Sequence, residues 1–126
     1  LIGECYVVEH QEIGVERVHQ KVKRVTRVMA ELGADLIKCF YTGAKFREVV
    51  DNLPIPAFTI GAEKLETDLE VLKKADDSVK RGARGVIFGR NIFMADRPEE
   101  IIKALKTVIN DGVSPYDAVA KYGLSS

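Results

Sequence analysis

Short, continuous apolar runs alternate along the chain with longer segments in which apolar residues recur every three or four positions. Such runs are typical of strands in parallel sheets, and the recurring positions predict helices with one apolar face. The predicted strands are residues 1–8, 34–40, 57–60 and 85–89. The predicted helices are residues 15–32, 44–51, 67–80, the single turn 90–94, 97–112 and 115–122. Strands that alternate with helices predict an α/β fold with a parallel sheet covered by helices, its strands apolar because both faces are buried.

Residues at the ends of these segments support the assignment. Thr67 and Glu70 have the spacing of a capping box at the start of a helix. Pro98 suits a first helical turn, and Gly33 and Gly112 follow helical patterns, as glycine commonly does. The boundaries therefore agree with the periodicity.

The four strand–helix units form a single domain, residues 1–126, and match half of a (β/α)8 barrel. A whole barrel usually needs roughly 200 residues or more. Half a barrel leaves two parallel edges unpaired, which favours pairing with another chain. We therefore expect either a further half upstream, with this chain truncated at its N-terminus, or a homo-oligomer formed through the exposed barrel edges. A small, complete, doubly wound sheet is the structural alternative.

Composition narrows the class of protein. Basic and acidic side chains balance at 19 each, which argues against nucleic-acid binding through bulk charge. There is no apolar run of membrane-spanning length, so no membrane role is expected.

Cys5 and Cys39 lie in apolar strand-like segments and lack metal-site spacing, which predicts free thiols in a reducing cytoplasm. His10 and His19 have no companions at metal-ligand spacing, and His19 is predicted to lie solvated on a polar helix face.

Lys38 stands in the middle of an apolar strand, where lysine is rare unless it is paired or functional. Alternation along the strand puts Lys38 on one face with Leu36 and Phe40. If that face lines a barrel, the amine lies near the carboxyl end of the strand, where barrel chemistry is located. Desolvation there would favour a neutral amine that can attack a carbonyl. The alternative is a structural lysine that reaches the rim or pairs with Glu4 or Asp35.

Tyr6 follows Glu4 by two residues and lies toward the end of the first strand, so the two can share a face. In a barrel, neighbouring strand ends meet at one mouth, which would bring this phenol near Lys38. A phenol beside a Schiff-base nitrogen can act as general acid and base. A tyrosine with its ring in the core and its hydroxyl at the rim explains the same pattern.

Two glycine-bearing turns, TIGAEK and FGRNIF, follow the third and fourth strands. As strands seven and eight of a barrel, they would end where phosphate often binds, beside a short extra helix. Gly61, Ala62 and Gly89 would let the backbone approach a phosphate, and Arg90 would add a charged fork. The alternative is that these glycines merely end strands.

Three stretches together are similar to a known family: GADLIKCFYTG (33–43), PIPAFTIGAEKLET (54–67) and GARGVIFGRNIF (82–93). They resemble the C-terminal half of the archaeal-type class I fructose-bisphosphate aldolases. That wider family includes an aminodideoxyheptulosonate synthase and the thiolase that processes phosphorylated autoinducer-2. The resemblance implies a TIM barrel without metal or cofactor. It also implies that Lys38 forms the Schiff base, that Tyr6 is the acid/base, and that Gly61, Ala62, Gly89 and Arg90 bind phosphate.

The chain departs from the family pattern in three places. Ile60 and Ala62 alter a turn that often reads Ser-Gly-Gly or Ala-Gly-Gly, which bears on phosphate affinity or substrate identity. Residues 7–9 read Val-Val-Glu where the family often has Pro-Arg-Gly, which argues against a plain fructose-bisphosphate aldolase. The family's first four strands, with a catalytic aspartate, are not represented, so we expect an incomplete site in this chain alone.

The sequence thus predicts a Schiff-base lyase or transferase for a phosphorylated ketose or related carbonyl compound. Two alternatives remain open. The chain is a catalytically incomplete barrel fragment that acts only by assembly, or it is a phosphate-ligand binding domain with no covalent step.

Overall fold

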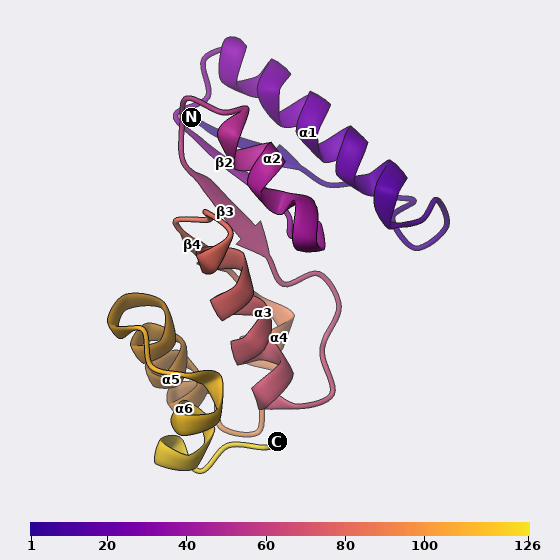
Figure 1. Ribbon diagram of the computed structural model, residues 1–126. Helices are drawn as coiled ribbons and strands as arrows, with labels where there is room; N and C mark the ends of the chain where they lie inside the picture. Colours follow the sequence, from indigo (N-terminus) through magenta and orange to yellow (C-terminus); the bar gives the residue numbers. More distant parts are fainter.

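Four parallel strands lie side by side in the order in which they occur in the sequence (Figure 1). The computed structural model describes residues 1–126. The strands are β1 (Ile2–Cys5), β2 (Leu36–Phe40), β3 (Ala57–Ile60) and β4 (Gly85–Ile87). The helices are α1 (Val15–Glu31), α2 (Phe46–Asp51) after the 3₁₀ turn η1 (Gly43–Lys45), α3 (Asp68–Lys80), α4 (Arg90–Phe93), α5 (Pro98–Asp111) and α6 (Pro115–Tyr122). Every predicted element is present, but β1 ends earlier than predicted, so Tyr6 lies just past the strand.

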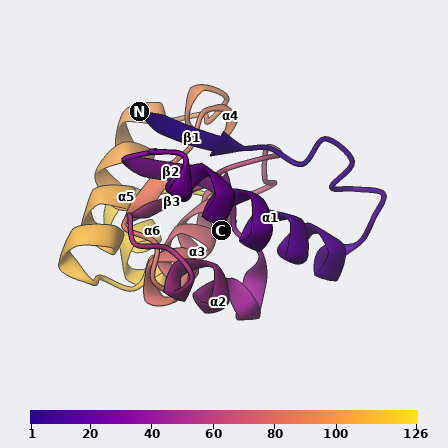
Figure 2. The same ribbon diagram turned by 90° about the horizontal axis from the view of Figure 1, so that it is seen from above.

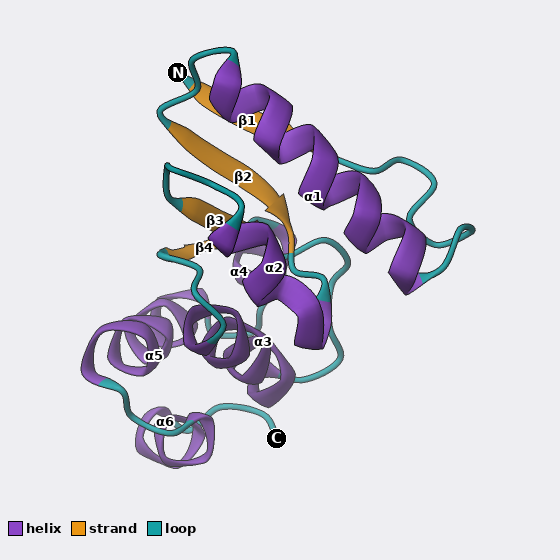
Figure 3. Ribbon diagram, turned by 45° about the horizontal axis from the view of Figure 1, so that its top comes forward, coloured by secondary structure: helices purple, strands orange, loops and turns teal.

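Helices α1, α2 and α3 lie on one face of the sheet (Figures 2 and 3). In β2, Ile37 and Cys39 point to this face and are fully buried with α1 and α2. A second apolar cluster joins α3, α5 and α6, with Phe88 from the end of β4. A doubly wound sheet would carry helices on both faces, so that alternative is wrong.

The other face of the sheet is open. Ile2 is 58% exposed and Ile87 is 38% exposed, although both belong to strands. The expectation that the strands are buried on both faces is therefore wrong at these positions, although Phe40 and Ile60, on the same face at the carboxyl ends of β2 and β3, are buried. Along one row of this face, Glu4, Lys38 and Phe58 are register partners.

Helix α3 begins as its sequence predicts. The Thr67 hydroxyl accepts a hydrogen bond from the backbone N–H of Glu70, and the Glu70 carboxylate accepts one from the backbone N–H of Thr67. This reciprocal pair fixes the direction in which α3 leaves the turn after β3.

None of the helices has the length and apolar character that crossing a bilayer requires.

Both cysteines are free and buried, which confirms the free-thiol prediction. Burial raises the pKa of the Cys39 thiol to about 12, with a smaller contribution from Cys5. Burial also raises the pKa of Cys5.

We expect both thiols to resist alkylation in the folded protein, because the thiolate is the reactive form. At pH 8, iodoacetamide should label Cys39 at least about 100-fold more slowly than it does after unfolding in urea, since raising its pKa from 9.0 to about 12 lowers the thiolate population about 1000-fold. Labelling of Cys5 should also be slower in the folded protein. Mass spectrometry of quenched samples measures the rates. Equal rates before and after unfolding would show that the two thiols are accessible.

Candidate functional site

Lys38 projects from β2 onto the open face of the sheet. Its Nζ lies 3.2 Å from Glu4 Oε1 of β1, and the lysine side chain is 27% exposed. The parallel register sets this pair, because Glu4 and Lys38 are direct neighbours across the two strands. Of the two carboxylates considered from the sequence, the structure selects Glu4. The amine is therefore partly buried, on the face of the sheet opposite α1 and α2.

Tyr6 joins an aromatic cluster at the carboxyl ends of β1 and β2. Its ring centroid lies 4.9 Å from that of Phe40 and 5.7 Å from that of His10. The Phe40 and His10 centroids are 4.8 Å apart. Phe40 is two residues beyond Lys38, so alternation puts the two on the same face. The cluster thus holds the Tyr6 ring at the carboxyl end of the sheet, past the position of Lys38 in β2.

The two glycine turns are brought together by Asn91, which is fully buried in α4. Its side-chain amide donates to the carbonyl of Glu63 at 2.9 Å and to that of Gly61 at 3.5 Å. Its side-chain oxygen accepts from the backbone N–H of Leu65 at 2.7 Å. One side chain from the second turn therefore fixes the backbone of the first.

Arg90 also connects the turns, because its Nη1 donates to Glu63 Oε2 at 3.1 Å. Gly89, the residue before α4, has open space where a side chain would stand. Gly61, Ala62, Gly89 and Arg90 are thus assembled at one end of the sheet. The Arg90 guanidinium already has a carboxylate partner, with which a bound anion would have to compete.

Ala62 has a left-handed backbone, with φ of 56°, and it is the only non-glycine residue of the chain with positive φ. This conformation is costly for a residue with a Cβ. It explains physically why a glycine would suit this position, and why the departure noted from the sequence affects the turn. Gly61 is constrained differently, because a Cβ there would lie 2.8 Å from Asn91 Nδ2.

Substitutions at Gly61 and at Ala62 should have opposite effects on the stability of the folded chain. Ala62→Gly should raise the free energy of unfolding by up to about 1 kcal/mol, since it relieves the left-handed strain. Gly61→Ala should lower it by about 1–3 kcal/mol, because the methyl group would displace a buried amide. Urea unfolding measures both effects, provided that the dependence of the free energy on urea concentration is the same in all variants. If Ala62→Gly lowered the stability, the backbone at Ala62 would not be strained.

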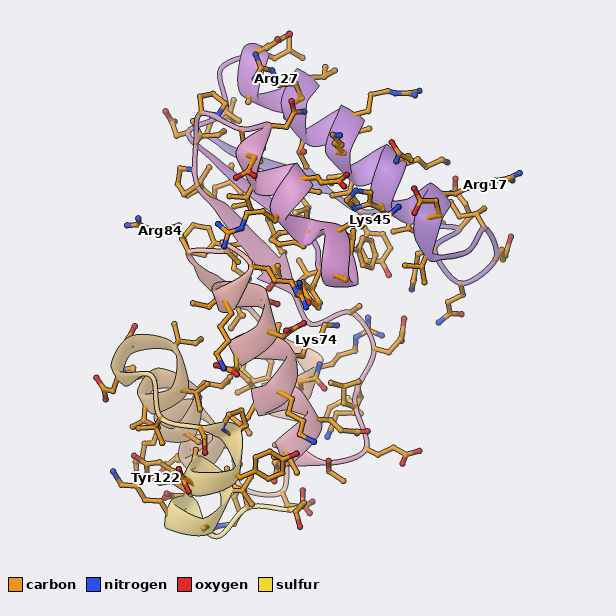
Figure 4. All side chains as sticks on the ribbon, in the orientation of Figure 1. Arg17, Arg27, Lys45, Lys74, Arg84 and Tyr122 are labelled. Carbon is orange, nitrogen blue, oxygen red and sulfur yellow. The ribbon has the colours of Figure 1, made fainter.

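A pocket of about 500 Å³ lies beneath the first glycine turn. The βα turn after β1, the ends of β2 and β3, and α3 line it, and Lys74 of α3 reaches it (Figure 4). Lys74 Nζ donates to the carbonyl of Gly61 at 2.8 Å, and burial lowers the pKa of this amine. The pocket includes Gly61 and Ala62 but not Lys38 or Tyr6. The pocket therefore does not reach Lys38, but it shares Phe40 with the face that carries Lys38 and His10 with the Tyr6 cluster.

His19 is buried, so the prediction that it is solvated is wrong. Its Nε2 donates to Glu48 Oε2 at 3.0 Å, and its Nδ1 lies 2.8 Å from Thr42 Oγ1. The hydrogen bond from His19 lowers the pKa of Glu48. The segment after β2 folds back over α1 and encloses this ring. Helical periodicity does not predict a contact between segments so far apart in the sequence.

Lys74 and Asn91 were not found from the sequence as site residues. Lys74 follows the buried Val71 by three residues and precedes the buried Ser78 by four, which places it beside the apolar stripe of α3. That spacing was the available signal for Lys74. No sequence signal pointed to Asn91, because its hydrogen-bond partners lie 26 to 30 residues away. No group of three or more His, Cys, Asp or Glu side chains is placed to share a metal ion.

Comparison with known proteins identifies relatives of this arrangement. A family model described as DeoC/LacD family aldolase matches residues 1–95. An uncharacterized aldolase of Saccharolobus solfataricus is 35% identical over 121 residues, which are 94% of this chain and 44% of that protein. A 3-hydroxy-5-phosphonooxypentane-2,4-dione thiolase of Shigella flexneri is 38% identical over 85 residues, which are 68% of this chain and 33% of the thiolase.

Solved structures agree with these sequence matches. An archaeal fructose 1,6-bisphosphate aldolase superposes with a TM-score of 0.76 at 26% identity, covering 86% of this chain and 44% of the aldolase. A structure of an archaeal fructose-1,6-bisphosphate aldolase with the catalytic Lys covalently bound to the carbinolamine intermediate of the substrate superposes with a TM-score of 0.71 at 27% identity. That match covers 78% of this chain and 40% of the aldolase.

The chain thus spans less than half the length of these relatives. The prediction of four parallel strand–helix units from a TIM-barrel aldolase is confirmed, as is the family resemblance. The relatives support an enzyme of the aldolase or lyase type. The chain belongs to the DeoC/LacD family of aldolases.

Proposed function

We propose that Lys38 forms a Schiff base with a phosphorylated ketose or related carbonyl compound, in a protein that breaks or transfers a carbon–carbon bond. The position of Lys38 carries the proposal: a partly buried amine on the barrel-interior face, 3.2 Å from Glu4 Oε1. A similar archaeal aldolase holds a carbinolamine on its catalytic lysine. Covalent attachment of this kind divides one difficult reaction into two easier ones.

Glu4 gives the amine a route to its neutral form. An ammonium next to a carboxylate can pass its proton to that carboxylate when a carbonyl carbon approaches. The Lys38 nitrogen then attacks, a C–N bond forms, and the carbinolamine loses water to give an iminium ion. That cation accepts the electron pair of the carbon–carbon bond that breaks, and Tyr6 moves protons at this end of the sheet.

The two glycine turns are proposed to hold the phosphate of the substrate. Their support is the arrangement around Asn91, which keeps the backbone of Gly61 and Ala62 near Gly89 and Arg90. A fixed phosphate turns binding energy into orientation of the reacting carbonyl. Arg90 would exchange its bond to Glu63 for a bond to the phosphate.

The proposal is tested by trapping. The chain is incubated with dihydroxyacetone phosphate and sodium borohydride, and peptides are mapped by mass spectrometry. An adduct on Lys38 is the expected result. No adduct in a folded sample would overturn the covalent proposal for this chain and favour an incomplete fragment.

Substitution of Arg90 should test phosphate binding separately from the covalent chemistry at Lys38. Arg90→Ala should weaken binding of dihydroxyacetone phosphate about tenfold, the loss of one charge-assisted contact of about 1.5 kcal/mol. Calorimetry without borohydride measures it. Lys106→Ala, an exposed position on α5, serves as the control. Unchanged affinity in Arg90→Ala would remove Arg90 from the phosphate site.

We also propose that the chain associates with a second copy through its barrel edges. Strands β1 and β4 lie at the two edges of the sheet and have no outer neighbour. The open face exposes Ile2 and Ile87. Edges and apolar faces of this kind favour association, and a second set of four strands would complete eight.

A further inference from the structure

Lys74 lies in surroundings unlike those of Lys38. Its amine forms no ion pair and donates one hydrogen bond, to the carbonyl oxygen of Gly61 at 2.8 Å. Burial lowers its pKa, and the charge of Glu63 opposes that effect only in part. In its uncharged form, which burial favours, this amine keeps its lone pair free while it donates one N–H to the carbonyl. Lys74 is therefore a candidate nucleophile, and it faces a pocket.

The pocket itself suits an apolar molecule. Its volume is about 500 Å³, within the range of small-molecule sites. Its apolar lining consists of Val15, Val18, Phe40, Tyr41, Ala62 and Leu65. Glu63 also lines the pocket, and its carboxylate is already paired with Arg90. An uncharged, apolar ligand fits this combination best.

His10 supplies a base in the same pocket. Its Nδ1 donates to the carbonyl of Val7 at 2.9 Å, so in the neutral ring Nε2 carries the free lone pair. Nε2 is buried and has no hydrogen-bond partner. It lies 3.5 Å from Glu63 Oε1. An orphaned basic nitrogen and an unpaired amine thus line one cavity.

We propose that this pocket, which borders the Lys38 face at Phe40 and the first glycine turn at Gly61 and Ala62, binds a small molecule of its own, and that Lys74 condenses there with an apolar aldehyde to form an imine. The Lys74 nitrogen attacks the aldehyde carbon, and a C–N bond forms while the C=O π bond breaks. His10 accepts one proton from the nitrogen and passes it to the oxygen, which gives a neutral carbinolamine. The C–O bond then breaks as the second nitrogen proton reaches the hydroxyl by way of His10, and the hydroxyl leaves as water. Amine and aldehyde give imine and water, and no oxidant or reductant is consumed.

The test uses hexanal as the probe, with sodium cyanoborohydride to fix any imine. The folded chain is sampled over time at pH 7, and mass spectrometry of peptides follows each lysine separately. We expect Lys74 to be alkylated several-fold faster than the exposed Lys106. Because its pKa is lowered, this advantage should shrink as the pH rises toward 10, where exposed amines also become neutral.

Variants locate the effect. Lys74→Gln should remove the fast labelling phase, whereas Lys73→Gln, at the exposed neighbouring position on α3, should keep it. His10→Phe retains an aromatic ring against Phe40 but lacks the base, so labelling of Lys74 should slow several-fold. Circular dichroism confirms that each variant is folded.

Two results would overturn the proposal: labelling of Lys74 no faster than that of Lys106 in the unmodified chain, or a fast phase that survives in Lys74→Gln. Neither result depends on Lys38. Trapping of dihydroxyacetone phosphate at Lys38 fails or succeeds independently of hexanal labelling at Lys74, so the two proposals are tested separately.

Discussion

Replacing Lys38 by methionine is expected to abolish the adduct trapped with dihydroxyacetone phosphate. Methionine keeps the length and apolar stem of the side chain, but it has no nitrogen that can bond to the carbonyl carbon. In a protein with the complete site, turnover should fall by more than about 10⁴-fold, the scale of effect when an enzyme loses its nucleophile. Intact-protein mass spectrometry reads the adduct, and a coupled assay of the released aldehyde reads turnover.

Lys38→Arg is the matched control for charge. A guanidinium can keep the ion pair with Glu4, yet it does not form a Schiff base. Stability should change little in either variant, by less than about 1 kcal/mol, because the Glu4 carboxylate is half exposed. An adduct that persists in both variants would place the reactive amine elsewhere in the chain.

Replacing Asn91 by leucine should give the largest loss of stability among single exchanges near the site. Leucine has a similar volume but leaves the N–H of Leu65 and the carbonyl of Glu63 without their partner. Each buried polar group without a partner costs about 1–3 kcal/mol, so we expect a loss of about 3 kcal/mol in the free energy of unfolding. Urea unfolding followed by circular dichroism measures the loss.

Asn110→Leu, at an exposed position near the end of α5, is the control for the same chemical exchange. Its effect should stay within about 0.5 kcal/mol. If Asn91→Leu were equally mild, the hydrogen bonds across the two turns would not hold them together. Binding of dihydroxyacetone phosphate should weaken in Asn91→Leu as well, since the backbone of the first turn would lose its support.

Much of the fold could be predicted from local patterns. The capping box of Thr67 and Glu70 marks the start of α3 because both hydrogen bonds join residues three positions apart. The apolar runs mark the strands because each has one face against the helices, as Ile37 and Cys39 show. The burial of the second face was predicted wrongly, since a run of apolar residues does not reveal whether a covering layer belongs to the same chain.

The candidate site was predictable only in part. Lys38 stands out because a charged residue interrupts an apolar strand, and the glycine turns stand out because they follow strands. His19 was misjudged because its partners, Thr42 and Glu48, lie 23 and 29 residues away. Lys74 was missed although its spacing from Val71 and Ser78 places it beside the apolar stripe of α3, because that spacing does not reveal the contact with Gly61, 13 residues away.

The sequence by itself determined the alternation of strands and helices, the helix boundaries and the face on which Lys38 lies. These follow from periodicity and from hydrogen bonds between residues a few positions apart. Only the tertiary structure decided that Glu4 pairs with Lys38, that Asn91 joins the two turns, and that Lys74 and His10 share a pocket. Those contacts depend on strand register and on where loops return, which are set by the packing of the whole chain.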